Sequence, residues 1–188
     1  MHVHLSSTNS PDYFTRREQP CPRELKNAHY GDTYRMAHIN MCLDMRSVVR
    51  AAGPVVDGTR ADVFYEVASR AALDDLLRDD PYVISGVWAS LRLRTLEHFV
   101  EPLSMIEVCL DASRGVVTVE GRVTDERHAL SALRRMRDAE VVAVGGLFED
   151  GTVVAWVRTS GPSEALACLA RGGLELQSAV CQSLVWVL

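Results

Sequence analysis

The stretch YRMAHINMCLDMRSVVRAAGPVVDG, residues 34–58, is the part of the chain around which the fold is organised. Its first half has the spacing of one helix face, which carries Tyr34, His38, Met41, Cys42 and Met45. Its second half, residues 48–54, predicts a short buried strand that stops at a Gly-Pro turn pair. His38 therefore lies on an apolar helix face, where an imidazole is either a structural core residue or an acid/base group beside a cavity.

Composition indicates a chain that buries a substantial core. At 188 residues and 47% apolar, it is long enough for one large or two small domains. The formal charge of −5 gives no electrostatic reason to expect a nucleic acid or an anionic membrane as partner. The five cysteines are scattered, odd in number and free of CxxC spacing, so we expect neither a disulfide scaffold nor a zinc site.

The cellular location is predicted from similar features. The first residues, MHVHL, do not show the basic segment followed by an apolar one that marks a secretory signal. No apolar run approaches the length that spans a membrane. We therefore expect a protein of the reducing cytoplasm.

The first half of the chain predicts the order strand, helix, strand, strand, helix, strand, which is that of the ferredoxin-like fold. The expected elements are a strand at 2–5, a loop at 6–22, a helix at 23–45 with a potential break at Gly31-Asp32, strands at 48–52 and 61–68, a helix at 70–78 and a strand at 83–93. Asp57-Gly58 marks the reversal between two strands, and Ser69 is a suitable N-cap for the second helix. Asp80-Pro81 ends that helix, because proline cannot continue it.

The second half of the sequence resembles the first. A shift of 93 positions places residues 48–95 on 141–188 without a gap. The residues that agree across this shift include Gly53 and Gly146, Asp57 and Asp150, Gly58 and Gly151, Leu73 and Leu166, and Leu76 and Leu169. Upstream, 124–137 predicts the matching helix and 115–123 the matching strand, while 105–111 fits a hairpin partner or an extra linking strand. We interpret this pattern as an internal repeat.

Two copies of such a unit have a simple physical outcome. Each sheet has both helices on one face, so packing the two bare faces together buries them. We therefore predict an α+β fold of two tandem ferredoxin-like (βαββαβ) repeats, residues 1–98 and 99–188, whose antiparallel sheets pack face to face as a pseudo-dimeric α/β barrel. The chain would be a monomer that mimics a dimer, or a homodimer.

Three motifs carry a family resemblance. They are Ala52-Gly53-Pro54, the run VFYEVASRAALDDLL at 63–77, and Asp80-Pro81-Tyr82-Val83 followed by Ser85-Gly86-Val87. With His38 about a helix length before the first motif, residues 35–93 resemble the YCII-like family of the dimeric α/β-barrel superfamily. The resemblance implies a small pocket between sheet and helices and a histidine that acts as acid/base with an aspartate.

The same resemblance implies cofactor-free chemistry on enolisable or phenolic molecules. A dehydrochlorinase of aromatic degradation is the clearest activity among similar proteins. Muconolactone isomerases, polyketide cyclases and antibiotic monooxygenases belong to related barrel families. The YCII-like family also contains members with no demonstrated activity, so a fold resemblance names no substrate.

The candidate catalytic residues are His38, Arg35 and Asp80. An imidazole with a pKa near neutrality can take up a proton and return it elsewhere. Arg35, one turn before His38, suits a planar oxyanion, although a surface ion pair with Asp32 or Asp44 is an equal alternative. Asp80 either ends a helix or completes a dyad. When the sequence is shifted by 93 positions, His38 aligns with Ser131, and the Asp-Pro-Tyr motif aligns with Gly173-Leu174-Glu175. Because the second repeat lacks these residues, we expect one site, in the first repeat.

The candidate substrate-binding residues are Tyr34, Met41, Tyr82 and Trp88. Tyr34 could donate a hydrogen bond to a developing oxyanion, and Trp88 could form a pocket wall, but core packing explains both as well. Met41 shares the helix face of His38, and Tyr82 belongs to the Asp-Pro-Tyr motif.

Other polar residues fit structural roles better. Asp57 could orient His38, but its counterpart Asp150 persists in the repeat without a histidine, which favours a turn role. His2 and His4 lie on one side of a strand and could form a metal pair, yet no third ligand has suitable spacing, so we expect no metal. His128 belongs to an arginine-rich helix whose charges fit a solvated face.

The sequence thus predicts a cofactor-independent isomerase, cyclase or lyase that acts on an enolisable polyketide-like or aromatic molecule, within secondary metabolism such as antibiotic biosynthesis. Cofactor-free oxygenation is a more distant alternative. The alternative of a different class is a non-catalytic ligand-binding or accessory module that positions an intermediate for a partner enzyme.

Overall fold

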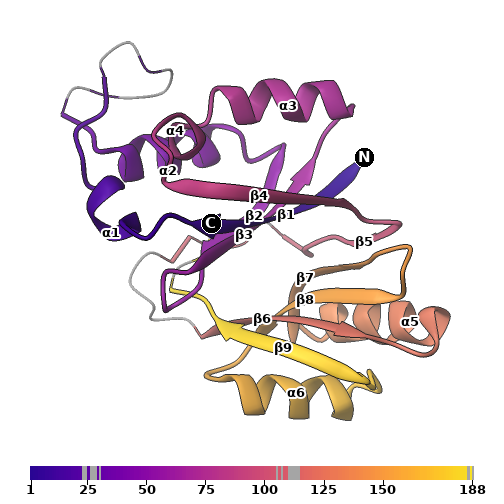
Figure 1. Ribbon diagram of the computed structural model, residues 1–188. Coiled ribbons are helices and arrows are strands. Elements are labelled where there is room, and N and C mark those ends of the chain that lie inside the picture. Colours follow the sequence, from indigo (N-terminus) through magenta and orange to yellow (C-terminus); the bar gives the residue numbers. More distant parts are fainter. Residues whose placement is uncertain are drawn as a thin grey trace.

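Two antiparallel sheets lie against each other in the computed structural model, with helices on the outer face of each (Figure 1). The structure describes residues 1–22, 25, 29, 31–104, 106, 108–109, 115–185 and 187. The fold is therefore α+β, of the ferredoxin-like α/β-barrel type that the sequence predicts.

The first sheet and its helices use residues 2–95. The strands are β1 (His2–Asn9), β2 (Val49–Pro54), β3 (Arg60–Glu66) and β4 (Trp88–Thr95), in the order β2-β3-β1-β4. The helices are α1 (Tyr13–Arg16), α2 (Tyr34–Asp44), α3 (Arg70–Arg78) and α4 (Pro81–Ile84). In Figure 1, α2, α3 and α4 lie on the side of this sheet that faces away from the second sheet.

The second sheet has the same strand order with one strand added. Its strands are β5 (His98–Val100), β6 (Val116–Arg122), β7 (Val142–Leu147), β8 (Thr152–Arg158) and β9 (Ser178–Ser183), in the order β5-β7-β8-β6-β9. Helices α5 (Glu126–Asp138) and α6 (Pro162–Arg171) cover its outer face (Figure 1). Counted from β6, the order is second, third, first, fourth strand, as in the first sheet.

Three apolar clusters hold these layers together. One lies between the first sheet and its helices and includes Leu5, Ile39 and Leu73. A second lies between the second sheet and α5 and α6, around Leu133 and Leu169. The third joins the two sheets and includes Phe64 of β3 and Trp156 of β8. Because the third cluster draws on the inner faces of both sheets, the face-to-face packing predicted above is confirmed.

Several local predictions are also confirmed. Helix α3 has the predicted bounds, and the Ser69 side chain accepts a hydrogen bond from the Ala72 N–H at 3.2 Å. The Asp57-Gly58 turn has Gly58 at φ +70°, and Asp57 accepts hydrogen bonds from the N–H and hydroxyl of Thr59. Glycine fits there because other residues rarely adopt a positive φ.

Five predicted elements were wrong in extent. Strand β1 continues through residues 6–9, and the remainder of the predicted loop contains α1. Gly53-Pro54 belongs to β2 and does not stop it. The predicted strand at 83–93 begins at Trp88, because Pro81–Ile84 forms a helical turn. Of the predicted helix at 23–45, α2 covers 34–44, and residues 23–24, 26–28 and 30 lie outside the described residues.

The segment between β4 and β6 differs from the prediction. Strand β5 pairs with β7 at the edge of the second sheet and was not predicted. The predicted element at 105–111 lies mainly outside the described residues, although Cys109 forms an isolated bridge with Val187. Among the described residues, no helix is long and apolar enough to cross a membrane.

Candidate functional site

A buried histidine and a buried aspartate meet between the first sheet and its helices. His38 Nδ1 lies 2.9 Å from Asp80 Oδ1, and the two residues are 2% and 0% exposed. The structure therefore joins two of the three predicted catalytic residues, which are 42 positions apart in sequence.

Local structure fixes both partners. His38 lies on α2, whose N-cap Thr33 accepts a hydrogen bond from the Met36 N–H. Asp80 is the N-cap of α4, where its Oδ1 accepts a hydrogen bond from the Tyr82 N–H at 2.8 Å. Pro81 occupies the first turn of α4, a position at which proline needs no N–H partner. Asp80 therefore begins the helical turn α4 and does not end α3, whose C-cap is Asp79, and it also contacts His38.

Aromatic rings enclose the imidazole. The Tyr82 ring stacks on His38 with centroids 4.1 Å apart and an interplanar angle of 9°. The Trp88 ring meets His38 edge-on at 5.0 Å. Two predicted substrate-binding residues, Tyr82 and Trp88, therefore contact the histidine itself. They hold its ring in one orientation, with Nδ1 toward Asp80.

Electrostatics favour the charged form of His38. Burial alone would lower the pKa of His38, but the adjacent Asp80 carboxylate, with a smaller contribution from Cys42, raises this pKa well above its usual value. The contact with Asp80 therefore favours the protonated imidazolium form of the ring. An imidazolium carries a proton on each nitrogen, so Nε2 retains a proton that it can donate.

Several polar atoms around the pair lack hydrogen-bond partners among the described residues. They are Asp80 Oδ2, the hydroxyls of Tyr65 and Tyr82, and Trp88 Nε1. Burial, the largest effect, and the nearby Asp80 carboxylate raise the pKa of Tyr65 well above its usual value, so this phenol keeps its proton. Buried polar groups in folded proteins are nearly always satisfied. Bound water or a polar ligand would satisfy these atoms.

Two members of this cluster were not singled out as site residues by the sequence analysis. Cys42 Sγ lies 3.8 Å from His38 Nε2, and Tyr65 is within electrostatic reach of Asp80. Both occupy positions that their sequence pattern identifies only as core. For Cys42, the i, i+4 spacing from His38 was the available signal.

A cavity of about 450 Å³ is lined by residues that are close in sequence to His38 and Asp80. It is lined by Met41, three residues after His38, and by Asp79, next to Asp80. Its remaining wall comes from β3 and from the two helices α2 and α3, with Glu66 and Asp75 among the lining residues. Met41, the third predicted substrate-binding residue, therefore lines this cavity.

The other two candidates lie further out. Arg35 Nη1 is 3.7 Å from Glu18 Oε1, so it forms an ion pair as the alternative interpretation held, with a different partner from Asp32 or Asp44. Its charge also lowers the pKa of the Tyr82 phenol, although burial is the largest effect and raises that pKa overall. Tyr34 is half-buried and packs against the helix–sheet cluster.

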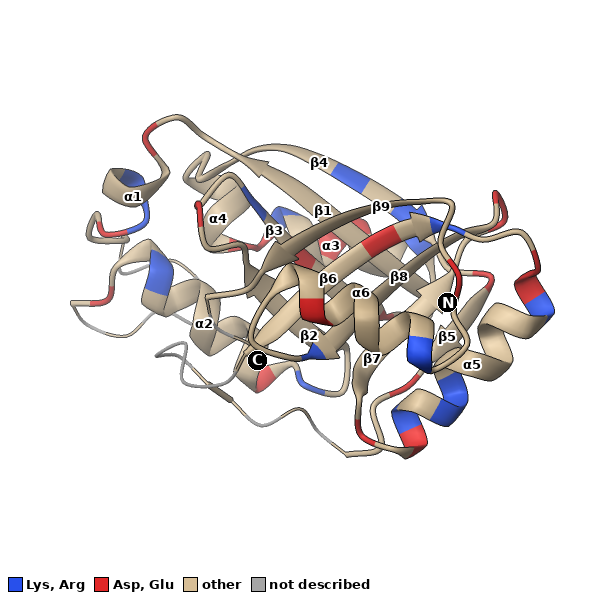
Figure 2. Cartoon of the chain, turned by 90° about the horizontal axis from the view of Figure 1, so that it is seen from below, with Lys and Arg blue, Asp and Glu red and all other residues tan. Residues whose placement is uncertain are grey.

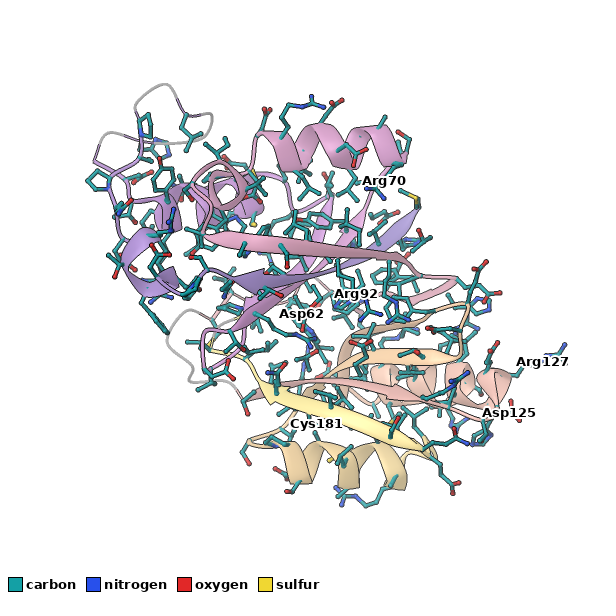
Figure 3. The ribbon with its side chains drawn as sticks, viewed as in Figure 1. Asp62, Arg70, Arg92, Asp125, Arg127 and Cys181 are labelled. Carbon is teal, nitrogen blue, oxygen red and sulfur yellow. The ribbon has the colours of Figure 1, made fainter. Side chains whose placement is uncertain are left out.

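A second histidine–aspartate contact lies on the opposite face of the same sheet. His4 Nε2 is 3.3 Å from Asp62 Oδ1, without hydrogen-bond geometry, and Arg60 Nη2 donates to both oxygens of Asp62 at 2.8 and 2.9 Å. Burial would raise the pKa of Asp62, but His4 and Arg60 together hold it below its usual value. Figure 3 shows Asp62 and Arg92 between the two sheets. Because the arginine neutralises Asp62, we interpret this group as a buried structural ion network.

Charges elsewhere are mixed. Figure 2 shows acidic and basic residues interspersed along the chain, with several basic ones on α5. There His128 Nε2 lies 2.9 Å from the Gly173 carbonyl oxygen, and Arg135 donates to Ser131.

Comparisons with known proteins support the fold. No protein-family model and no curated protein matches this chain. A candidate monooxygenase from Lactobacillus acidophilus NCFM has a similar structure, with a TM-score of 0.58 and 8% identity over 98% of this chain and 92% of that one. At this identity the similarity shows a shared fold alone.

Two further solved structures match less closely. One is a 5-chloro-2-hydroxyhydroquinone dehydrochlorinase from Burkholderia phenoliruptrix AC1100 in complex with 2,5-dihydroxybenzoquinone, with a TM-score of 0.41, 15% identity, and coverage of 52% of this chain and 95% of that one. The other is an anthrone oxidase-like protein, with a TM-score of 0.46, 13% identity, and coverage of 100% and 90%. At these TM-scores neither carries an argument about function.

Proposed function

We propose that this chain is a cofactor-free enzyme that uses the His38–Asp80 pair for acid/base chemistry on a small enolisable molecule, polyketide-like or aromatic. The observation that carries the proposal is the 2.9 Å contact between His38 Nδ1 and Asp80 Oδ1 inside an aromatic enclosure. A carboxylate on Nδ1 fixes the ring and stabilises its charged form, which leaves Nε2 as the atom that exchanges protons with a substrate.

The raised pKa of His38 supports one order of proton transfers. At neutral pH the imidazolium acts first as a general acid, donating the Nε2 proton to an oxygen or carbon that gains negative charge. The neutral ring then takes a proton from another atom of the same molecule. The two transfers return the enzyme to its starting state, as an isomerisation, cyclisation or elimination requires.

The unpartnered donors around the pair support the same chemistry. The Tyr65 and Tyr82 hydroxyls are buried and protonated, so either can donate a hydrogen bond to an enolate or phenolate oxygen. Arg35, Met41 and Trp88 would complete the binding surface, and Tyr34 would lie at its margin. His38 is only 2% exposed, so binding requires the side chains over Nε2 to move.

Three broader points belong to the same proposal. The motifs at 52–54, 63–77 and 80–87 favour a place within the YCII-like family. The halves 1–98 and 99–188 would be tandem copies of one unit, of which the first holds the site. The chain would act as a monomer or homodimer in the cytoplasm, in secondary metabolism, without nucleic acid or membrane partners.

One observation favours a second candidate. The enclosure of His38 also fits a non-catalytic module in which the ion pair is structural and the cavity beside Met41 holds an intermediate for a partner enzyme. That cavity is lined by apolar side chains with carboxylates among them, so it would accept a neutral or cationic molecule more readily than an anion.

A genetic comparison tests the proposal. A strain lacking the gene is complemented with wild type, with His38→Gln, or with His128→Gln as a matched exposed control, and its metabolites are compared. We expect His38→Gln, once shown to be folded and present at wild-type level, to leave the intermediate that accumulates in the deletion strain. Restoration of the wild-type profile by His38→Gln would refute the acid/base role.

The purified protein then separates the two candidates. The accumulated intermediate is mixed with wild-type protein alone and followed by mass spectrometry and calorimetry. Conversion without added cofactor supports the enzyme. Saturable binding without conversion supports the accessory module.

A further inference from the structure

Three potential metal ligands meet at the seam between the two sheets. His2 is the first residue of β1, Glu66 the last of β3, and Glu101 follows β5 directly. One ligand atom from each lies within 4.8 Å of the others. Ligand spacing in the sequence does not reveal this cluster, because its residues are 64 and 35 positions apart. Strand pairing brings the first two together, since His2 is the direct partner of Glu66 in the antiparallel register.

The imidazole of His2 is held in place and its Nε2 is free to coordinate. The ring stacks on Phe99 of β5 with centroids 4.5 Å apart and an interplanar angle of 17°. Nε2 is buried and has no hydrogen-bond partner among the described residues, while Glu66 Oε1 lies 3.7 Å from it.

The two carboxylates are positioned separately. Arg50 Nε lies 3.8 Å from Glu66 Oε2, which leaves Oε1 toward His2. The Glu101 carbonyl accepts a hydrogen bond from Arg137 of α5 at 2.8 Å, which anchors that residue's backbone and leaves its side chain available. Two carboxylates this close repel each other, and a single arginine on the far oxygen of one of them does not cancel that repulsion.

We propose that His2, Glu66 and Glu101 form a binding site for one divalent transition-metal ion, with Zn²⁺ as the best fit. One imidazole and two carboxylates are borderline and hard ligands that suit Zn²⁺ or Mn²⁺, whereas Mg²⁺ and Ca²⁺ prefer oxygen alone. Three protein ligands leave one tetrahedral position for water or a ligand. Ligand atoms about 2 Å from the ion lie roughly 3.4 Å apart in a tetrahedron, so a modest side-chain movement closes the site.

The site is independent of the His38–Asp80 pair. His2 and His4 lie on the same face of β1, and His4 contacts Phe148, which directly follows β7 of the second sheet. This face is turned toward the second sheet, whereas His38 lies on the helix side of the first sheet. Glu66 belongs to the first sheet and Glu101 to the segment that enters the second. A bound ion would therefore cross-link the two sheets near the chain's N-terminal strand.

Metal titration tests the proposal. Protein purified without a polyhistidine tag, stripped with a chelator and desalted, is titrated with Zn²⁺ by calorimetry and with Co²⁺ by visible spectroscopy. We expect one ion per chain, a Co²⁺ spectrum without a thiolate charge-transfer band, and a rise in melting temperature with Zn²⁺ that equal Mg²⁺ does not produce. Glu101→Gln and His2→Gln should each weaken Zn²⁺ binding at least ~10-fold.

Matched controls make the outcome decisive. His98→Gln and Glu97→Gln change the same residue types within the same linking segment and should bind as wild type does. Glu101 is exposed, so its substitution should leave the fold intact. The proposal is overturned by the absence of stoichiometric binding, by unchanged affinity in both ligand variants, or by a thiolate band, which would place the ion on cysteine.

Discussion

The two halves of the molecule share a strand order but differ completely at the position of the ion pair. A shift of 93 places His38 on Ser131 and Asp80 on Gly173. In the first half those residues are 2% and 0% exposed and form a charged contact. In the second half Ser131 is exposed and accepts a hydrogen bond from Arg135. The second half therefore forms the same strand order without a buried charge pair at these two described positions.

The environment of the pair changes together with it. The same shift aligns four residues around the pair with residues of another kind: Cys42 with Arg135, Tyr65 with Arg158, Tyr82 with Glu175, and Trp88 with Cys181. Of these counterparts, the two arginines and the glutamate are exposed. Helix α4 has no counterpart among the described residues of the second half, where β9 begins soon after α6. A buried charge pair costs desolvation that apolar packing avoids. Its confinement to one half is the pattern expected of a site rather than of a requirement of the fold.

The largest effect should come from breaking the pair. Asp80→Ala leaves His38 without its carboxylate and α4 without its N-cap, and should reduce the unfolding free energy by about 3–5 kcal/mol. Asp80→Asn retains the cap and should recover about 1 kcal/mol of that loss. The counterpart substitution Ser131→Ala should stay within ~0.5 kcal/mol of wild type. Urea unfolding measures the free energy of unfolding of all three variants. A loss below about 1 kcal/mol for Asp80→Ala would show that the pair contributes little to stability.

The helices that follow the third strand of each half offer the next comparison. Leu73 and Leu166 correspond in the aligned sequences, yet Leu73 is 0% exposed and Leu166 39%. The two helices bury different faces. The buried residues of α6 are Ala165 and Leu169, whereas those of α3 are Leu73, Leu76 and Leu77. Leu73→Ala should cost about 2–5 kcal/mol and Leu166→Ala less than ~1 kcal/mol. Equal losses in thermal or urea unfolding would mean that the two helices bury the same face.

The pH dependence of stability tests the charge state of His38. Its pKa is raised in the folded protein, so its contribution is fully present below the unfolded value of about 6.5 and is lost as pH rises through the folded pKa. The stability difference between wild type and His38→Gln should therefore shrink above pH ~6.5, by at most about 1.4 kcal/mol per pH unit. Asp80→Asn removes the cause of the shift and should reduce the same slope. A difference that is constant or grows with pH would mean that His38 is buried in its neutral form.

Much of the fold could be predicted from the sequence because its signals are local. The Ser69 cap, the Asp-Gly turns and the apolar face of α3 each lie within a few residues. Helix α4 was missed because Asp80-Pro81 marks the end of one helix as clearly as it marks the start of the next. The polar second half of β1 was missed because Ser7 and Asn9 are polar yet buried: Ser7 accepts a hydrogen bond from the Ala61 N–H, and the Asn9 amide donates one to the Gly58 carbonyl.

The site was predicted only in part for a related reason. His38 stood out because it interrupts an apolar helix face, and Asp80 because it begins a motif. Tyr65 and Cys42 did not stand out, because a tyrosine or cysteine in an apolar pattern indicates core. The contacts of His2 with Glu66 and Glu101 depend on strand register and on an unpredicted strand, neither of which composition or spacing reveals.

The smallest expected effect concerns a feature that the two halves share. Gly58 and Gly151 have φ values of +70° and +72°, and each follows an aspartate that accepts a hydrogen bond from the N–H two residues after that aspartate. Alanine at either position must adopt a left-handed conformation, so Gly58→Ala and Gly151→Ala should each cost about 1–2 kcal/mol. A new Cβ at Gly58 would meet the Phe14 ring at 2.6 Å, but that side chain is exposed and can turn away, so the two losses should agree within ~0.5 kcal/mol. A much larger loss at Gly58 in paired urea unfolding curves would mean that Phe14 and α1 are fixed parts of the first half. The asymmetry between the halves would then extend from the ion pair to the turn that both halves build in the same way.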